Sequence, residues 1–258
     1  MSGLTLKDIT GNIDFLYNQP QQTFHNSFTG RSAILDSFMH VGSDGKAYYL
    51  DNVLIGSDGL VQAFNSGLKL DVENNIVEVE MPEGGFLAYY TTIPRYLEKW
   101  SPELKTWLTD EAMRAIYEAY EMACIIGVTD ADSFEPMVDS PLAATIPGTQ
   151  STLASDITTA VGMIKGSNEV FAVVSKANMA YIRQANLNDL GATVIEADWM
   201  PDDKVAVYSK DAYAVKGDTV AESFENLKLA VNERELLVEI WGSGTVFKPD
   251  SVVIIEVA

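Results

Sequence analysis

The stretch Gly244–Ala258, GTVFKPDSVVIIEVA, decides how the rest of the sequence is interpreted. An uninterrupted β-branched run, Val252–Ile255, begins just after Pro249 and lies almost at the end of the chain. Chain termini usually lie at the surface and fray. A continuous apolar run, however, is typical of a strand that is buried on both faces. The sequence therefore predicts that the terminal strand inserts into a sheet, with Ile254 in the core.

The composition indicates a globular protein. The chain has 258 residues, of which 47% are hydrophobic and 21% are charged, so one large domain or two small ones are expected. No stretch approaches the roughly 20 apolar residues of a membrane helix. The N-terminus lacks the basic start and apolar block of a signal peptide. We expect no membrane contact, and a protein that is made and kept in the cytoplasm or released by lysis.

Charge and residue types argue against several classes of function. The formal net charge is −20, and the 17 basic residues are scattered. A surface that grips phosphate backbones needs clustered Lys and Arg, although an acidic wall can still surround nucleic acid. Cys124 is the only cysteine, which excludes an internal disulfide and a Cys-rich zinc site. His25 and His40 leave little material for a Ser-His-Asp triad, and neither GxGxxG nor GxxxxGK[ST] occurs.

Two acidic stretches admit a metal-binding interpretation. GSDG occurs twice, with Asp44 and Asp58, and Asp130, Asp132 and Glu135 lie in a Pro- and Ser-rich linker. Asp-Gly turns and helix-cap chemistry account for both stretches. The remaining acidic ligands and the bidentate Glu of a calcium loop are missing. We therefore predict no metal site, no cofactor and no catalytic residue.

The N-terminal third is predicted to be extended. Residues 1–40 have no sustained hydrophobic period, and Phe24, Phe28 and Phe38 need a surface to lie on. This favours an arm that is buried against another part of the protein or another subunit. Residues 41–82 have the alternation of β-strands in a long hairpin. A lone two-stranded ribbon is only marginally stable in water, so we expect it to lean on something else.

The strongest helix signal covers residues 102–126. Ser101 is a favourable N-cap, Pro102 suits the first helical position, and Gly127 is a natural stop. Apolar residues recur between these ends at steps of three and four, and we predict that Trp107 and Ile116 among them are buried. The apolar residues are Leu104, Trp107, Leu108, Ala112, Ala115, Ile116, Ala119, Tyr120, Ala123 and Ile126. We interpret Cys124, in the last turn, as a small core residue rather than a nucleophile.

Residues 150–217 have the alternating pattern of a small α/β unit. An amphipathic helix is predicted over 152–165, followed by the buried strand EVFAVVS. Ser175 then caps a helix that runs to about Leu187. The stretches LGATVIEA, DKVAVYS and DAYAVKG follow as strands, and ENLKLAVNERELLVEIWG is a long strand or strand pair ahead of the terminal run.

The order of these elements and the closing sequence resemble one family. The closing piece has a long strand through Asn232–Glu235 (NERE), a turn with Pro249, and a short aliphatic strand. EVFAVVSKANMAYIRQ is similar to the family's strand-then-helix step. With the polar arm, the hairpin and the long capped helix, the chain resembles the major capsid proteins of tailed bacteriophages with the Hong Kong 97-type fold. The resemblance covers nearly all of the chain by element order, and residues 84–127 and 168–258 in detail.

The resemblance implies an α+β fold with named parts. The structural residues that we single out are Trp107, Ile116, Gly127, Pro249 and Ile254. The implied parts are an N-terminal arm over 1–40, an E-loop β-hairpin over 41–83, a P-domain over 84–149 with its spine helix at 102–126, an A-domain over 150–217, the long P-domain strand or strands over 218–250, and the terminal strand over 251–258 that returns to the A-domain sheet.

The resemblance also implies a function. A major capsid protein self-assembles as hexamers and pentamers into an icosahedral shell in the host bacterial cytoplasm. The virion shell then encloses double-stranded DNA without sequence-specific binding. The expected partners are other copies of the chain and a portal. Because Met1 directly precedes the arm, we expect a separate scaffolding protein, or none, or a sequence that starts late. Some relatives crosslink an E-loop lysine, but Lys46 and Lys69 are interpreted as solubilising.

Three alternatives stay open. An encapsulin shell has the same fold but begins with an amphipathic helix, which YNQPQQTFHNSF does not resemble. An α/β enzyme needs a cluster of polar catalytic residues that one Cys and two His hardly supply. A phage tail or head-completion protein forms rings or tubes rather than closed shells.

Overall fold

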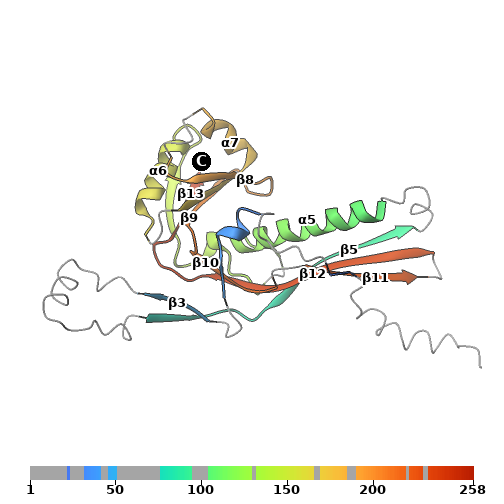
Figure 1. Cartoon of the computed structure of the whole chain (residues 1–258). Helices are drawn as coiled ribbons and strands as arrows, with labels where there is room; N and C mark the ends of the chain where they lie inside the picture. Colours follow the sequence, from blue (N-terminus) through green and yellow to red (C-terminus); the bar gives the residue numbers. More distant parts are fainter. Residues whose placement is uncertain are drawn as a thin grey trace, which may run out of the picture.

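The computed structural model describes residues 22–23, 32–41, 46–50, 76–94, 104–129, 132–165, 169–184, 190–218, 221–228 and 232–258, whose strands form two sheets and a two-stranded ribbon (Figure 1). The helices are α5 (Leu104–Ile125), α6 (Leu153–Met163) and α7 (Lys176–Ile182), with the short 3₁₀ helices η1 (Leu35–Ser37) and η4 (Met137–Asp139). The strands are β1 (Gln22–Thr23), β2 (Met39–His40), β3 (Lys46–Leu50), β4 (Ile76–Glu80), β5 (Gly85–Pro94), β6 (Ala144–Gly148), β7 (Val170–Val174), β8 (Thr193–Glu196), β9 (Lys204–Ser209), β10 (Tyr213–Gly217), β11 (Glu222–Lys228), β12 (Glu233–Val246) and β13 (Val252–Val257).

The terminal strand lies inside the five-stranded sheet. The strand order is β6-β13-β9-β7-β8, and β13 runs parallel to β6 and antiparallel to β9. Val253 and Ile255 pack in the core shared with α6, whereas Val252 and Ile254 pack in the core shared with α5. The apolar run is continuous because the two faces of this strand meet two different cores.

The second sheet is built around β12, the longest strand. β5 and β11 pair antiparallel along its two sides, and β10 pairs with its last residues from Gly242 onward. Helix α5 packs on one face of this sheet, against β12 and β5, and runs alongside both strands (Figure 1). Ile116 and Tyr120 of α5 share a buried cluster with Leu236, Val238 and Ile240 of β12.

Helix α5 ends where the sequence predicts, but one residue that we predicted to be buried is exposed. Gly127 has a positive φ of 82°, and its amide donates to the Met122 carbonyl at 3.0 Å. Ile116 is only 2% exposed, but Trp107 is 58% exposed. At about 3.6 residues per turn, these two positions lie some two and a half turns apart and face opposite sides of the helix. Trp107 is therefore a surface residue.

Strand pairing also corrects two of the expected boundaries. β6 falls within 84–149, which we assigned to the P-domain, but it pairs with β13 in the five-stranded sheet. β10 falls within 150–217, assigned to the A-domain, but it pairs with β12. Neighbours in a sheet are chosen by hydrogen bonding between segments that are distant in sequence, which local patterns do not reveal.

Part of the expected arm is a core element of the chain itself. Residues 32–41 (the strap) include Ile34, Leu35 and Phe38, which lie in the same buried cluster as α5. β2, within the strap, pairs parallel with β10. The ribbon of β3 and β4 extends from the opposite side of the molecule from the outer end of α5 (Figure 1). The Asp44, Asp58, Phe24 and Phe28 predictions lie outside the described residues.

Candidate functional site

The sheet built around β12 has six strands. Its face opposite α5 carries exposed aromatic side chains. Alternation along β5 points Leu87 toward the core of α5 and Phe86 and Tyr90 toward the other face. Phe86 is 67% exposed and Tyr90 is 51% exposed. Their partners across β12 are Trp241 and Leu237. We call this set of residues, together with Phe224 opposite Leu237 on β11, the uncovered face.

A polar cluster lies at one end of the uncovered face, next to Tyr90. Glu235 is buried, and its carboxylate accepts hydrogen bonds from the Tyr90 hydroxyl and, at 3.2 Å, from the Asn226 side chain. On the opposite face of the same strands, Arg234 donates to Glu225 at 2.8 Å. These contacts join β5, β12 and β11 across the sheet and fix the position of the Tyr90 hydroxyl.

Gly242 and Gly244, near the end of β12, allow two tyrosine side chains to pack directly against the strand. A Cβ atom on Gly242 would lie 2.5 Å from the Tyr120 hydroxyl, and one on Gly244 would lie 2.4 Å from Cε1 of Tyr213. Real side chains do not approach so closely. The two tyrosine rings therefore occupy the space that the glycines leave. Here the pairing of β12 with β5 ends at Gly242, and on the other side of β12 the partner changes from β11 to β10.

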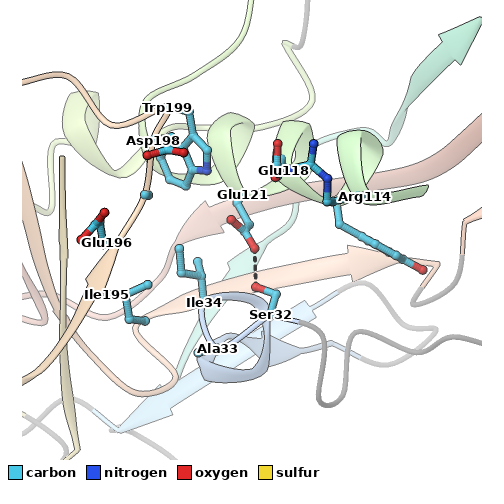
Figure 2. A pocket seen from close by; sticks show the side chains of 12 residues that line it. Ser32, Ala33, Ile34, Arg114, Glu118, Glu121, Ile195, Glu196, Asp198 and Trp199 are labelled. Atoms are coloured by element: carbon cyan, nitrogen blue, oxygen red, sulfur yellow. Dashed lines mark hydrogen bonds and ion pairs between the residues drawn. The ribbon is translucent and has the colours of Figure 1, made fainter. Parts of the chain in front are cut away.

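A pocket of about 940 Å³ lies where the strap, α5 and the turn after β8 meet (Figure 2). Its walls carry carboxylates from two elements, Glu118 and Glu121 of α5 and Glu196 and Asp198 of the β8 region, next to the ring of Trp199. Arg114 pairs with Glu118 at 2.5 Å and also with Glu111. The pocket is thus acidic, with an apolar wall of aromatic and aliphatic groups.

The fold matches capsid structures over nearly its whole length. The capsid of the native GTA particle has a TM-score of 0.61 at 13% identity, covering 99% of this chain and 100% of that chain. A structure of Mycobacterium phage Cain has a TM-score of 0.59 at 10% identity, covering 100% and 99%. A virus-like particle from Pyrococcus furiosus has a TM-score of 0.58 at 11% identity, covering 88% and 93%. The chain has the Hong Kong 97-type capsid fold.

Sequence similarity alone does not reach this conclusion. No protein-family model matches the chain, and no curated protein matches it either. At identities of 10–13%, what the chain shares with these capsids is its fold.

The acidic linker has a structural place within the Hong Kong 97-type fold. The Thr245 hydroxyl donates to the carboxylate of Glu135, whose backbone amide donates to the Gly244 carbonyl at 2.8 Å. Tyr213 donates to the Glu135 carbonyl at 2.9 Å. Glu135 therefore fastens the linker to β12 through contacts with residues distant in sequence, and not through the turn or cap chemistry that we expected for it. Among the described residues, no group of three or more His, Cys, Asp and Glu side chains is placed to hold a metal ion.

The other singled-out residues also have clear positions. Ile254 is buried in β13, and Pro249 lies exposed in the turn before that strand. Cys124 is buried, and burial raises the pKa of its thiol well above the usual value. Lys46 forms an exposed ion pair with Glu78 across the ribbon. In the part of the chain that the structure covers, no helix is both long and apolar enough to span a membrane.

Sequence reasoning missed the two surfaces described above. The aromatic residues of GFLAYYTT were not singled out, because apolar residues occur on both faces of this strand. Glu121 lies inside the apolar run of α5 and was not singled out. The spacing of Arg114, Glu118 and Glu121 at steps of four and three places them on one flank of a helix, which is a signal that was available.

Proposed function

We propose that the chain is a major capsid protein that self-assembles into an icosahedral shell enclosing the double-stranded DNA of a tailed bacteriophage. The observation that carries the proposal is the full-length match to capsid subunits. The fold spans 99% of this chain and 100% of the chain from the native GTA particle. A match over both whole lengths means that the fold of one capsid subunit accounts for the entire chain.

The uncovered face supports a role in assembly. Phe86 and Tyr90 are large, exposed side chains on one face of the sheet, and the Tyr90 hydroxyl donates to Glu235. Clustered exposed apolar groups are uncommon on monomers and typically mark contact surfaces. A second copy of the chain is the occupant that a shell supplies, because symmetry repeats the same contact around the particle.

The parts of the fold are assigned by the same proposal. Residues before the strap act as the arm, and residues 41–83 act as the E-loop that reaches a neighbouring subunit. α5 is the spine helix of the P-domain, and the five-stranded sheet with α6 and α7 is the A-domain. Ile116, Gly127, Pro249 and Ile254 have structural roles in this assignment, and Trp107 is available for contacts between subunits.

The proposed partners follow from assembly and charge. Copies of the chain form hexamers and pentamers, with a portal at one vertex and a separate scaffolding protein during assembly in the host cytoplasm. The satellite phage P4 procapsid, whose capsid protein has a TM-score of 0.59 to this chain, includes a size determination protein. A net charge of −20 suits a wall that encloses DNA without gripping it.

Electron microscopy of the purified protein tests the proposal directly. Negative staining and light scattering on one sample, with and without co-expressed scaffolding protein, should show closed particles tens of nanometres across. A uniform monomer or small ring in both preparations would contradict the proposal. Flat rings or open tubes would instead favour a tail or head-completion protein.

A nanocompartment shell of the encapsulin type is the alternative function. The similarity to a virus-like particle from Pyrococcus furiosus is the observation that keeps it open. The contents of the particles separate the two functions. DNA protected from nuclease inside particles from the native source supports the phage capsid, whereas a packaged enzyme supports the nanocompartment.

A further inference from the structure

The strap connects three parts of the subunit. The Ser37 hydroxyl donates to Tyr208 of β9 at 3.1 Å, and the Ser37 carbonyl accepts from the Asp211 amide at 2.9 Å. The Val41 amide donates to the Val215 carbonyl of β10 at 2.8 Å. β9 and β10 belong to different sheets. The strap therefore fastens the two sheets to each other, and a further polar anchor of the strap is on α5.

That anchor is Glu121. Its carboxylate accepts a hydrogen bond from the Ser32 hydroxyl at the start of the strap (Figure 2). The Trp199 indole, in the turn after β8, also donates to Glu121. The Ser32 hydroxyl oxygen is itself held in place, because it accepts from the Leu35 amide at 3.0 Å. One carboxyl group on α5 thus joins the helix, the strap and the five-stranded sheet.

The surroundings of Glu121 do not favour its negative charge. Glu118 and Arg114 face the same pocket from α5 and are paired with each other, while Glu196 pairs with Arg183 at 2.8 Å and Asp198 lies beyond it. The negative charge of Glu121 also contributes to raising the pKa of the buried Cys124 thiol and of the buried Tyr208 hydroxyl. Among the described residues, no Lys or Arg forms an ion pair with Glu121. A carboxylate walled in by apolar groups and other carboxylates is costly to keep ionised.

We propose that Glu121 is an acid-sensitive latch: protonation of its carboxyl group tightens the strap and the turn after β8 onto α5, and ionisation loosens them. The pocket admits solvent, so the proton exchanges without unfolding of the subunit. The protonated group keeps a carbonyl oxygen whose two lone pairs can accept from both Ser32 and Trp199, and protonation removes one negative charge from the acidic wall. This inference stands apart from shell assembly and concerns the single subunit.

The direction of the pH effect follows from linkage. Burial raises the pKa of Glu121, the hydrogen bonds from Ser32 and Trp199 partly oppose that rise, and Glu118 adds to it. The extra stability of the junction is therefore fully present below the unfolded pKa of about 4.3. It is lost as the pH rises through the raised pKa of the folded protein. Each unit of difference between these two pKa values changes the closed-to-open ratio of the latch by about tenfold.

Hydrogen exchange on the full-length subunit, kept unassembled, tests the latch. Protection factors, corrected for intrinsic exchange, are measured by mass spectrometry for strap amides from about pH 5 to about pH 8. In the wild-type protein, protection of the Asp36, Ser37 and Phe38 amides should fall as the pH rises. In Glu121→Gln, which keeps an acceptor and removes the charge, protection should be high and should no longer fall as the pH rises. Burial lowers the pKa of His40 in the strap, and the effect of His40 on protection has the opposite sign.

Two further variants keep the test decisive. Glu118→Gln removes a neighbouring carboxylate that already has an ion-pair partner, so the pH dependence of the strap should remain. Ser32→Ala removes the hydroxyl donor but keeps the Glu121 charge, so protection should fall overall while its dependence on pH persists. The proposal is overturned if the wild-type strap shows no pH dependence, or if Glu121→Gln retains it. If Glu121→Gln does not fold, loss of the pH dependence in Ser32→Ala overturns the proposal.

Discussion

At the scale of single residues, α5 offers a matched pair of apolar side chains on opposite sides of one helix. Ile116 is buried against β12, so Ile116→Ala leaves a cavity and should lower the free energy of unfolding by about 2–5 kcal/mol. Trp107 is exposed, so Trp107→Ala should change it by no more than about 0.5 kcal/mol. Urea unfolding of the unassembled subunit, followed by circular dichroism, measures both. Equal losses in the two variants would contradict the placement of α5.

Helix caps and helix ends could be predicted residue by residue. Which side chains of a helix face the core could not always be predicted. Ser175 caps α7 by accepting from the Asn178 amide at 3.2 Å, and Gly127 ends α5 with a positive φ, both as predicted. These signals depend only on neighbours in sequence. Trp107 was misplaced because steps of three and four can be followed along more than one line of a helix. Only the sheet beneath α5 decides which line is buried.

At the scale of elements, the terminal strand is the sharpest test of the fold. β13 is flanked by β6 and β9, and its two faces contribute to two cores. Deleting residues 252–258 removes an interior strand, so the edge strand β6 loses its described partner and β9 is left unpaired along one side. We expect an insoluble or unfolded product, measured by the soluble fraction and far-ultraviolet circular dichroism. Ile254→Val, which removes one methylene group, is the control and should cost about 0.5–1.5 kcal/mol while folding normally. A soluble truncated protein that still assembles would refute this account of β13.

The existence of the elements could be predicted, but their partners could not. The strands within EVFAVVS, DKVAVYS and SVVIIEV were all expected from runs of β-branched residues. The change of partner from β11 to β10 along one side of β12 was not expected, because strand partners are set by contacts between segments that are distant in sequence. The same limit applies to the pocket at Glu121, whose walls come from three distant segments.

At the scale of the whole molecule, the ribbon separates folding of the subunit from assembly of the shell. Its base belongs to the body, because Ala47 of β3 is buried with Ala214 and Phe247. Leu50 and Ile76 are paired where β3 ends and β4 begins. Residues 51–75 between them can therefore be replaced by Asn-Gly, a dipeptide that closes a two-residue hairpin, without disturbing the base.

The shortened subunit should fold and fail to form shells. Its circular dichroism spectrum and melting temperature, measured on unassembled protein, should match those of the wild type, since the buried clusters are retained. Electron microscopy and light scattering should show no closed particles, because each subunit loses a contact that the shell repeats at every symmetry-related position. Wild-type yields of closed particles would show that 51–75 is dispensable for assembly. Loss of the folded state would show instead that this segment belongs to the subunit core, and the proposed division between body and E-loop would then be wrong.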